Sequence, residues 1–139
     1  MSTVFETVIA GVTVFVTGQI IIKFMVEPIL ELKSLLGKIT QIFLRNQGQI
    51  ISANANQEIE DLIFTLASEL LQRRQAILWY KYLSCIYGLP TYKNVLNAAK
   101  ELNLIGNLVS TQKADEQVKI YNAMAKIEQY LKINISYNK

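Results

Sequence analysis

Residues 7–22 read TVIAGVTVFVTGQIII and carry no charged side chain. Lys23 follows, and the apolar run continues to Val26 before Glu27 and Pro28 close it. Roughly 20 residues of α-helix measure about 30 Å, which matches the hydrocarbon core of a bilayer. Lys23 stands near the end of the run, where a lysine can extend its ammonium group to the lipid headgroups. We therefore expect a transmembrane helix within residues 1–27.

Two other kinds of structure also contain such a run. A secretory signal peptide needs a basic segment before the apolar one and a small-residue cleavage site after it. This chain has Glu6 and no lysine or arginine there, which disfavours a signal peptide. A soluble protein would instead bury the helix in its core, and that alternative stays open.

The composition limits the chemistry that the chain can perform. It has 139 residues, the length of one domain, and 51% are apolar while only 18% are charged. It contains no histidine and one cysteine, Cys85. These counts exclude Ser-His-Asp and Cys-His catalysis, a His/Cys zinc site and an intrachain disulfide. Because a glycine-rich phosphate loop is also missing, we expect no enzyme activity, no cofactor and no metal.

The basic residues set the expected orientation. None precedes the apolar run, whereas Lys23, Lys33, Lys38 and Arg45 follow it. The positive-inside rule then puts the N-terminus outside and residues 28–139 in the cytoplasm. A single free cysteine agrees with a reducing compartment. The expected protein is a single-pass membrane protein with a cytoplasmic helical domain.

Two faces of the expected span carry residues of interest. Gly11 and Gly18 lie on a face of small residues, which lets helices approach closely in a membrane, so they are candidates for an interface between copies. Gln19, Lys23 and Glu27 recur every four residues on a second face. In a ring of subunits this stripe would line or gate a water-filled opening. The alternative is that Gln19 bonds to a neighbouring helix and Lys23 only reaches the membrane surface.

Beyond Pro28 the apolar residues recur at alternating spacings of three and four, the pattern of a coiled-coil or bundle seam. A long helix with such a seam needs a partner, which is either a later helix of the same chain or a neighbouring copy. We assign the seam to an interface between copies. Its residues are Ile29, Leu32, Leu36, Ile39 and Phe43.

Three further helices are expected after the polar break at residues 46–56. The first starts near Asn54 or Asn56 and runs to about residue 87, where Gly88-Leu89-Pro90 ends it. The others span about 91–109 and 115–133, and the apolar positions of the last are Val118, Tyr121, Met124, Ile127 and Leu131. No segment alternates with period two. The expected fold is all-α, with one transmembrane helix that continues into a small cytoplasmic bundle, about four helices in all.

Arg73 and Arg74 form the densest basic pair, followed by aromatic residues at 79–82. Arginines beside aromatic rings bind RNA by phosphate contacts and stacking, and they also bind anionic lipid headgroups. A solvated helix face is the simpler interpretation of such a pair. We keep both arginines as candidate contacts with lipid or RNA and do not expect a nucleic-acid partner.

The sequence resembles a family of small bacterial membrane proteins with one N-terminal span. The resemblance rests on Gly18-Gln19, Glu27-Pro28-Ile29, Gly37 and Ile39 around the span. It extends over about residues 8–108. Weaker similarities in the second half are Leu66-Ala67-Ser68-Glu69-Leu70, Trp79-Tyr80, Gly88-Leu89-Pro90, Ala98, Ala99 and Leu108.

Proteins of this shape look like the membrane accessory protein of type VI-B CRISPR loci, a ring-shaped pore that acts in antiphage defence. The resemblance implies a homo-oligomeric channel that permeabilises the bacterial inner membrane, with another defence-system protein as partner. That accessory protein carries a degenerate ribonuclease signature that includes a histidine, and this chain has none. Ribonuclease activity is therefore not implied. The alternative function is a membrane-anchored adaptor or scaffold whose helical bundle recruits a partner protein.

Overall fold

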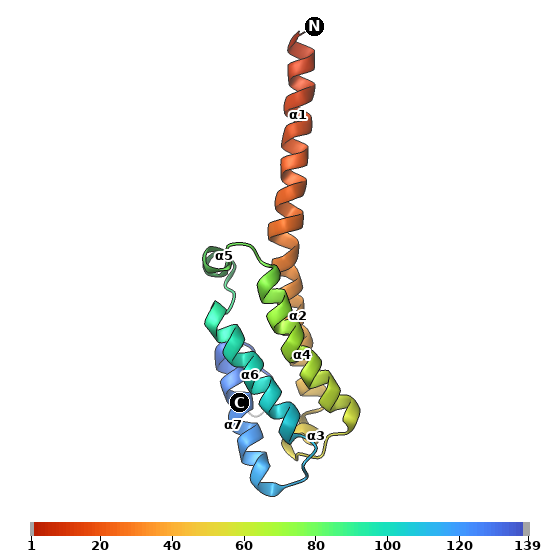
Figure 1. Cartoon of the computed structure of the whole chain (residues 1–139), viewed down its shortest axis with the longest axis vertical. Helices are drawn as coiled ribbons and strands as arrows, with labels where there is room; N and C mark the ends of the chain where they lie inside the picture. The colour runs from red at the N-terminus through yellow and green to blue at the C-terminus, as the bar shows by residue number, and fades with distance from the viewer. Residues whose placement is uncertain (1, 138–139) are drawn as a thin grey trace.

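The computed structural model describes residues 2–137, in which one long helix projects from a bundle of shorter ones (Figure 1). α1 (Ser2–Ile21), a π-helical segment (Ile22–Val26) and α2 (Glu27–Arg45) follow one another without a break. The remaining helices are α3 (Gln47–Ile51), α4 (Gln57–Ala76), α5 (Tyr80–Tyr87), α6 (Tyr92–Leu108) and α7 (Ala114–Leu131). With residues 2–45 taken as one helix, the described residues form six helices and no strand. The all-α prediction is confirmed, but the expected number of about four helices is wrong.

Capping groups lie at the helix ends that we predicted in the bundle. The side chain of Asn56 accepts a hydrogen bond from the backbone N–H of Ile59 at 3.0 Å and starts α4. Thr91 Oγ1 accepts one from the N–H of Asn94 at 3.2 Å and starts α6. Gly88 ends α5 with φ +66°, a left-handed conformation that glycine adopts without steric cost.

The two additional helices come from places where the local sequence gives little signal. α3 is a single short helix inside the polar break. The predicted helix from residue 56 to 87 is interrupted at Ile77, whose backbone is extended, and at Trp79, which has φ 52°. No glycine or proline marks this interruption. The extended backbone at Ile77 instead accompanies a side chain that is only 5% exposed, so core packing accounts for the break better than local propensity does.

The core lies between four helices packed in sequence: α2 on α4, α4 on α6, and α6 on α7. Gly106 of α6 permits the close approach to α4, because a Cβ atom there would lie 2.7 Å from Cε1 of Phe64. The largest fully buried side chains are Phe43, Ile29, Leu32, Ile39, Ile50, Ile63, Leu66, Leu70, Leu102, Ile105, Ile120 and Met124.

The apolar positions of α7 divide into a buried set in its second half and an exposed set in its first. Met124, Ile127 and Leu131 are buried, but Val118 and Tyr121 are 63% and 49% exposed. The buried side chains of the first half are instead Ile120 and Ala123. These two continue the face of Met124 and Ile127 at helical spacing, whereas Val118 and Tyr121 lie to one side of it.

The π-helical segment lies directly before Pro28. Proline has no N–H, and its ring clashes with the carbonyl four residues earlier, so it normally kinks or breaks a helix. Here the N–H of Glu27 donates to the carbonyl of Ile22, five residues back. This wider turn changes the hydrogen-bond pattern before the proline, and the helix continues into α2.

Candidate functional site

α1 is apolar on all sides and is not covered by the rest of the chain. No residue of α1 is buried, and its large apolar side chains are 47–73% exposed. The helix that it forms with α2 is long and apolar enough to cross a membrane, and none of its most apolar window is buried. The alternative of a first helix buried in the core of its own chain is therefore wrong.

The polar stripe of Gln19, Lys23 and Glu27 lies where α1 passes into the π-helical segment. All three residues are exposed, and their side chains have no hydrogen-bond or ion-pair partner among residues 2–137. A π-helical turn takes roughly one residue more than an α-helical turn of about 3.6 residues. Eight residues then fill about two turns, which aligns Gln19 with Glu27 more closely than an uninterrupted α-helix would.

The face of small residues on α1 is also open. A Cβ atom added at Gly11 or Gly18 would meet no other atom within 4 Å. Thr7 lies on this face, and its hydroxyl donates to the carbonyl of Thr3 at 2.8 Å within the same helix, so it needs no outside partner. The face is therefore free to receive a second helix.

The seam of α2 requires a correction. We assigned Leu32, Leu36, Ile39 and Phe43 to an interface between copies, but these side chains are at most 9% exposed within one chain. α4 packs against α2 and covers them. Both partners that we considered would bury such a seam, and the pattern alone does not distinguish them. The structure selects the later helix of the same chain.

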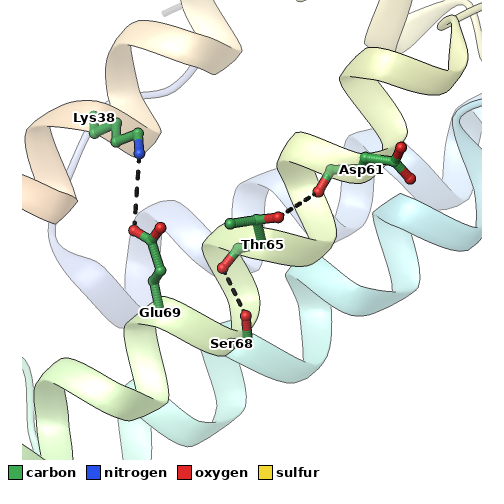
Figure 2. Close-up of polar contacts among 5 residues, drawn as sticks. All are labelled: Lys38, Asp61, Thr65, Ser68 and Glu69. Atoms are coloured by element: carbon green, nitrogen blue, oxygen red, sulfur yellow. Dashed lines mark hydrogen bonds and ion pairs between the residues drawn. The ribbon is translucent and has the colours of Figure 1, made fainter.

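Two ion pairs at the surface join α2 to α4. Nζ of Lys38 lies 3.8 Å from Oε2 of Glu69, and NH1 of Arg73 lies 2.7 Å from Oε2 of Glu31. Figure 2 shows Lys38 reaching across to Glu69, while the hydroxyls of Thr65 and Ser68 donate to carbonyls of α4 itself. The reverse direction of α4 would place like charges opposite each other. The charges thus favour the antiparallel pairing that is observed.

Arg73 and Arg74 do not act together. The guanidinium of Arg73 binds Glu31 at the surface. Arg74 is only 7% exposed, its NH1 donates to the carbonyl of Tyr92 at 2.9 Å, and its Cζ lies 3.7 Å from the centre of the Tyr92 ring. Arg74 is therefore wrong as a contact with lipid or RNA, because it joins the end of α4 to the start of α6. For Arg73 this role stays a prediction.

Tyr80 lies beside this arginine on the buried side of α5. Its hydroxyl donates to the carbonyl of Pro90 at 2.6 Å, and its ring meets the ring of Tyr92 edge-on with the centres 5.7 Å apart. Burial raises the pKa of the Tyr80 hydroxyl to about 12, against the smaller opposing effect of the Arg74 charge. These contacts hold α5 at its place on the bundle.

The outer side of α5 is the feature that the sequence analysis missed. Trp79, Tyr82 and Ile86 are 70–74% exposed, although each is large and apolar. We expected residues 79–82 to lie within one long helix, where aromatic residues usually pack into a core or at a contact between subunits. The available signal was the density of large apolar and aromatic residues at positions 77–87, which exceeds what one buried stripe of a short helix can accommodate.

Within residues 2–137, no group of His, Cys, Asp or Glu side chains is placed to hold a metal ion. Comparisons with known proteins found no match: no family model, no curated protein and no solved structure matches the chain. The candidate site therefore rests on the residues themselves. It comprises the exposed apolar helix, its stripe of small residues and its polar stripe.

Proposed function

We propose that this chain is a single-span membrane protein that assembles through α1 into a homo-oligomer, with the polar stripe lining an ion path. The span is α1 with the π-helical segment, the N-terminus lies outside, and the bundle from α2 to α7 lies in the cytoplasm. The positive residues after the span support this orientation. The resemblance to pore-forming accessory proteins adds the bacterial inner membrane and antiphage defence as the setting.

The unpartnered side chain of Gln19 carries the proposal. Gln19 precedes the end of the apolar run at Val26 by seven residues, about 10 Å along a helix, which places its amide among acyl chains. An amide in hydrocarbon is costly unless it finds a hydrogen-bond partner or water. No described residue of the same chain bonds to it. A second copy of α1, or water enclosed by several copies, would satisfy it.

The buried seam restricts how copies meet. Because α4 covers Leu32, Leu36, Ile39 and Phe43, the contacts between copies fall on α1. Gly11 and Gly18 are open to a neighbouring helix, and the polar stripe is exposed as well. The polar stripe lies roughly opposite the small face, so packing through the small face alone would turn it away from the contact. A ring that encloses an ion path therefore needs Gln19, Lys23 and Glu27 to face the shared axis. The lysine and glutamate rings would then set the ion preference.

The test is ion flux from liposomes that contain the purified protein. We expect flux from the unmodified chain, and a several-fold loss in Gln19→Leu and in Lys23→Leu with the oligomer mass unchanged. Thr13→Val is the matched control, because its hydroxyl is already bonded within α1 and its loss removes polarity from the span without altering the stripe. A wild-type chain that reconstitutes but gives no flux would overturn the pore.

One observation favours a second candidate, the membrane-anchored adaptor. The bundle buries its own seam and needs no second copy to complete its core. In that case α1 only anchors the chain, and the bundle recruits a partner protein. Liposomes would stay sealed, and Gln19→Leu and Lys23→Leu would leave partner recruitment unchanged.

A further inference from the structure

α5 and the residues before it form an apolar surface at the end of the bundle from which α1 projects (Figure 1). Trp79 is 71% exposed, Tyr82 70% and Ile86 74%, and Leu78 beside them is 53% exposed. Trp79 has a left-handed backbone with φ 52°, which is unusual for a bulky residue and holds its ring outside the bundle. Nothing within residues 2–137 covers this surface.

We propose that α5 is an interfacial helix that rests on the bilayer leaflet through which α1 leaves the membrane. The inference relies on the proposed transmembrane placement of α1 and deepens it. The exposed side of α5 would sit among the lipid headgroups, with Trp79, Tyr82 and Ile86 directed into the upper acyl layer. The buried side, which includes Tyr80 and Leu83, stays on the bundle.

The direction of α5 fits this placement. In Figure 1 α1 runs along the length of the view while α5 is seen nearly end-on, so α5 lies across the direction of α1. A helix that lies across a transmembrane helix is oriented along the plane of the membrane. Interfacial helices take this orientation, with their apolar side buried at the boundary between headgroups and acyl chains.

The position of α5 along the axis of the long helix also agrees with an interfacial placement. The ring of Tyr87, the last residue of α5, has Nζ of Lys33 at 5.9 Å from its centre, so the end of α5 lies near Lys33. Lys33 follows Val26, the end of the apolar run, by about 10 Å of helix. The headgroup layer of each leaflet is roughly 5–8 Å thick, and a helix has a radius of about 5 Å. The outer side of α5 therefore reaches the headgroup layer.

The residue types are those of a membrane interface. Tryptophan and tyrosine gather at the headgroup level because their rings are apolar and their N–H and O–H groups stay in the wet layer. Lys81 and Lys93 line a hollow between α5 and the start of α6, and the ammonium group of neither bonds to a described residue. Basic residues outnumber acidic ones at the end of the bundle from which α1 projects. The basic residues are Lys23, Lys33, Arg73, Lys81 and Lys93, and the acidic ones are Glu27 and Glu31. The surface thus matches a leaflet with anionic phospholipids.

The test uses Trp79, the only tryptophan of the chain, as an internal reporter. The full-length protein is placed in nanodiscs of phosphatidylcholine with phosphatidylserine. Its emission, its quenching by brominated lipid and its quenching by iodide are then measured. We expect blue-shifted emission, strong quenching by lipid brominated near the headgroup, and several-fold weaker quenching by iodide than for free tryptophan. Water-like emission with strong iodide quenching and no effect of brominated lipid would overturn the proposal.

Two variants sharpen the test. Trp79→Phe combined with Val118→Trp moves the reporter to the start of α7, at the opposite end of the bundle (Figure 1), where Val118 is 63% exposed. This reporter should behave as in water. Tyr82→Glu with Ile86→Glu puts two charges on the exposed side of α5 and should restore iodide quenching of Trp79 several-fold. Because both side chains are largely exposed, the bundle should remain folded by circular dichroism.

Two further observations distinguish the interfacial helix from the transmembrane placement: the effect of phosphatidylserine, and whether the chain enters nanodiscs. Lys81→Glu with Lys93→Glu should remove the added protection that phosphatidylserine gives Trp79, and free phosphate should not replace that lipid. A chain that co-purifies with nanodiscs but keeps Trp79 in water overturns the interfacial helix alone. A chain that does not enter nanodiscs overturns the transmembrane placement and this inference with it.

Discussion

Phe15 and Phe43 have the same side chain and lie on one continuous helix, yet the first is 65% exposed and the second is fully buried. The first belongs to α1, where apolar residues surround the helix on all sides and nothing in the chain covers them. The second belongs to α2, where apolar residues form one stripe that α4 covers. An apolar stripe is satisfied by one neighbouring helix, whereas a helix that is apolar all round needs an apolar surrounding. The contrast separates the part of the chain that its own helices bury from the part that they leave uncovered.

We expect the largest difference in the free energy of unfolding between the alanine variants of these two phenylalanines. Phe43→Ala should lower the free energy of unfolding of the bundle by about 3–5 kcal/mol, because it removes a fully buried ring and leaves a cavity. Phe15→Ala should change it by less than about 0.5 kcal/mol, since its ring contacts no core. Urea unfolding in mild detergent, followed by circular dichroism, measures both. Equal losses would mean that α1 packs on the bundle.

The two adjacent arginines give the next largest contrast at neutral pH. Arg74→Ala should cost about 2 kcal/mol, because it removes a buried bond to the Tyr92 carbonyl and a stacking contact with the Tyr92 ring. Arg73→Ala should cost less than about 1 kcal/mol, since its ion pair with Glu31 is exposed to water. The same unfolding assay compares them. A larger cost at Arg73 would contradict the assignment of Arg74 as the structural residue.

We predict that the folded bundle loses stability in alkaline solution because of Tyr80. Its pKa is about 12 in the folded chain and about 10 in the unfolded chain, so folding favours the neutral hydroxyl. This contribution is complete below pH 10 and is lost as the pH rises from 10 through 12, by about 3 kcal/mol in all. Tyr80→Phe should remove this part of the pH dependence, and Tyr82→Phe, at an exposed ring, should not. Identical pH profiles for the two variants would show that Tyr80 is not buried as described.

We expect the smallest change in the free energy of unfolding when the ion pairs between α2 and α4 are altered. Glu69→Lys should cost about 0.5–1 kcal/mol, because it opposes Lys38 with a like charge, and adding Lys38→Glu should restore most of the loss. High salt should reduce both changes. If the double variant were no more stable than the sum of the single ones, the two side chains would not be coupled. The antiparallel register would then rest on the apolar contacts alone.

The sequence predicted the apolar helix, the polar break and the helix ends at Asn56, Gly88 and Thr91, because caps, turns and runs of apolar residues act locally. The assignment of the seam at Leu32 and Phe43 to a neighbouring copy was wrong, since a neighbouring copy and a later helix produce the same periodic pattern. We also missed the break at residues 77–79, where no glycine or proline marks the end of α4. That break depends on contacts distant in sequence, among them the bond from Tyr80 to Pro90 and the stacking of Arg74 on Tyr92. Of the candidate site, the faces of α1 were predictable and the outer surface of α5 was not.

We propose that lipid and other copies of the chain cover α1. Light scattering of the full-length chain in mild detergent, corrected for the bound micelle, measures the mass of the assembly. We expect the chain to need detergent to stay in solution and its protein mass to be a multiple of the 15.8 kDa of one chain, as in a closed ring. A mass of one chain would contradict assembly through α1, and a chain that is soluble without detergent would contradict the membrane span itself.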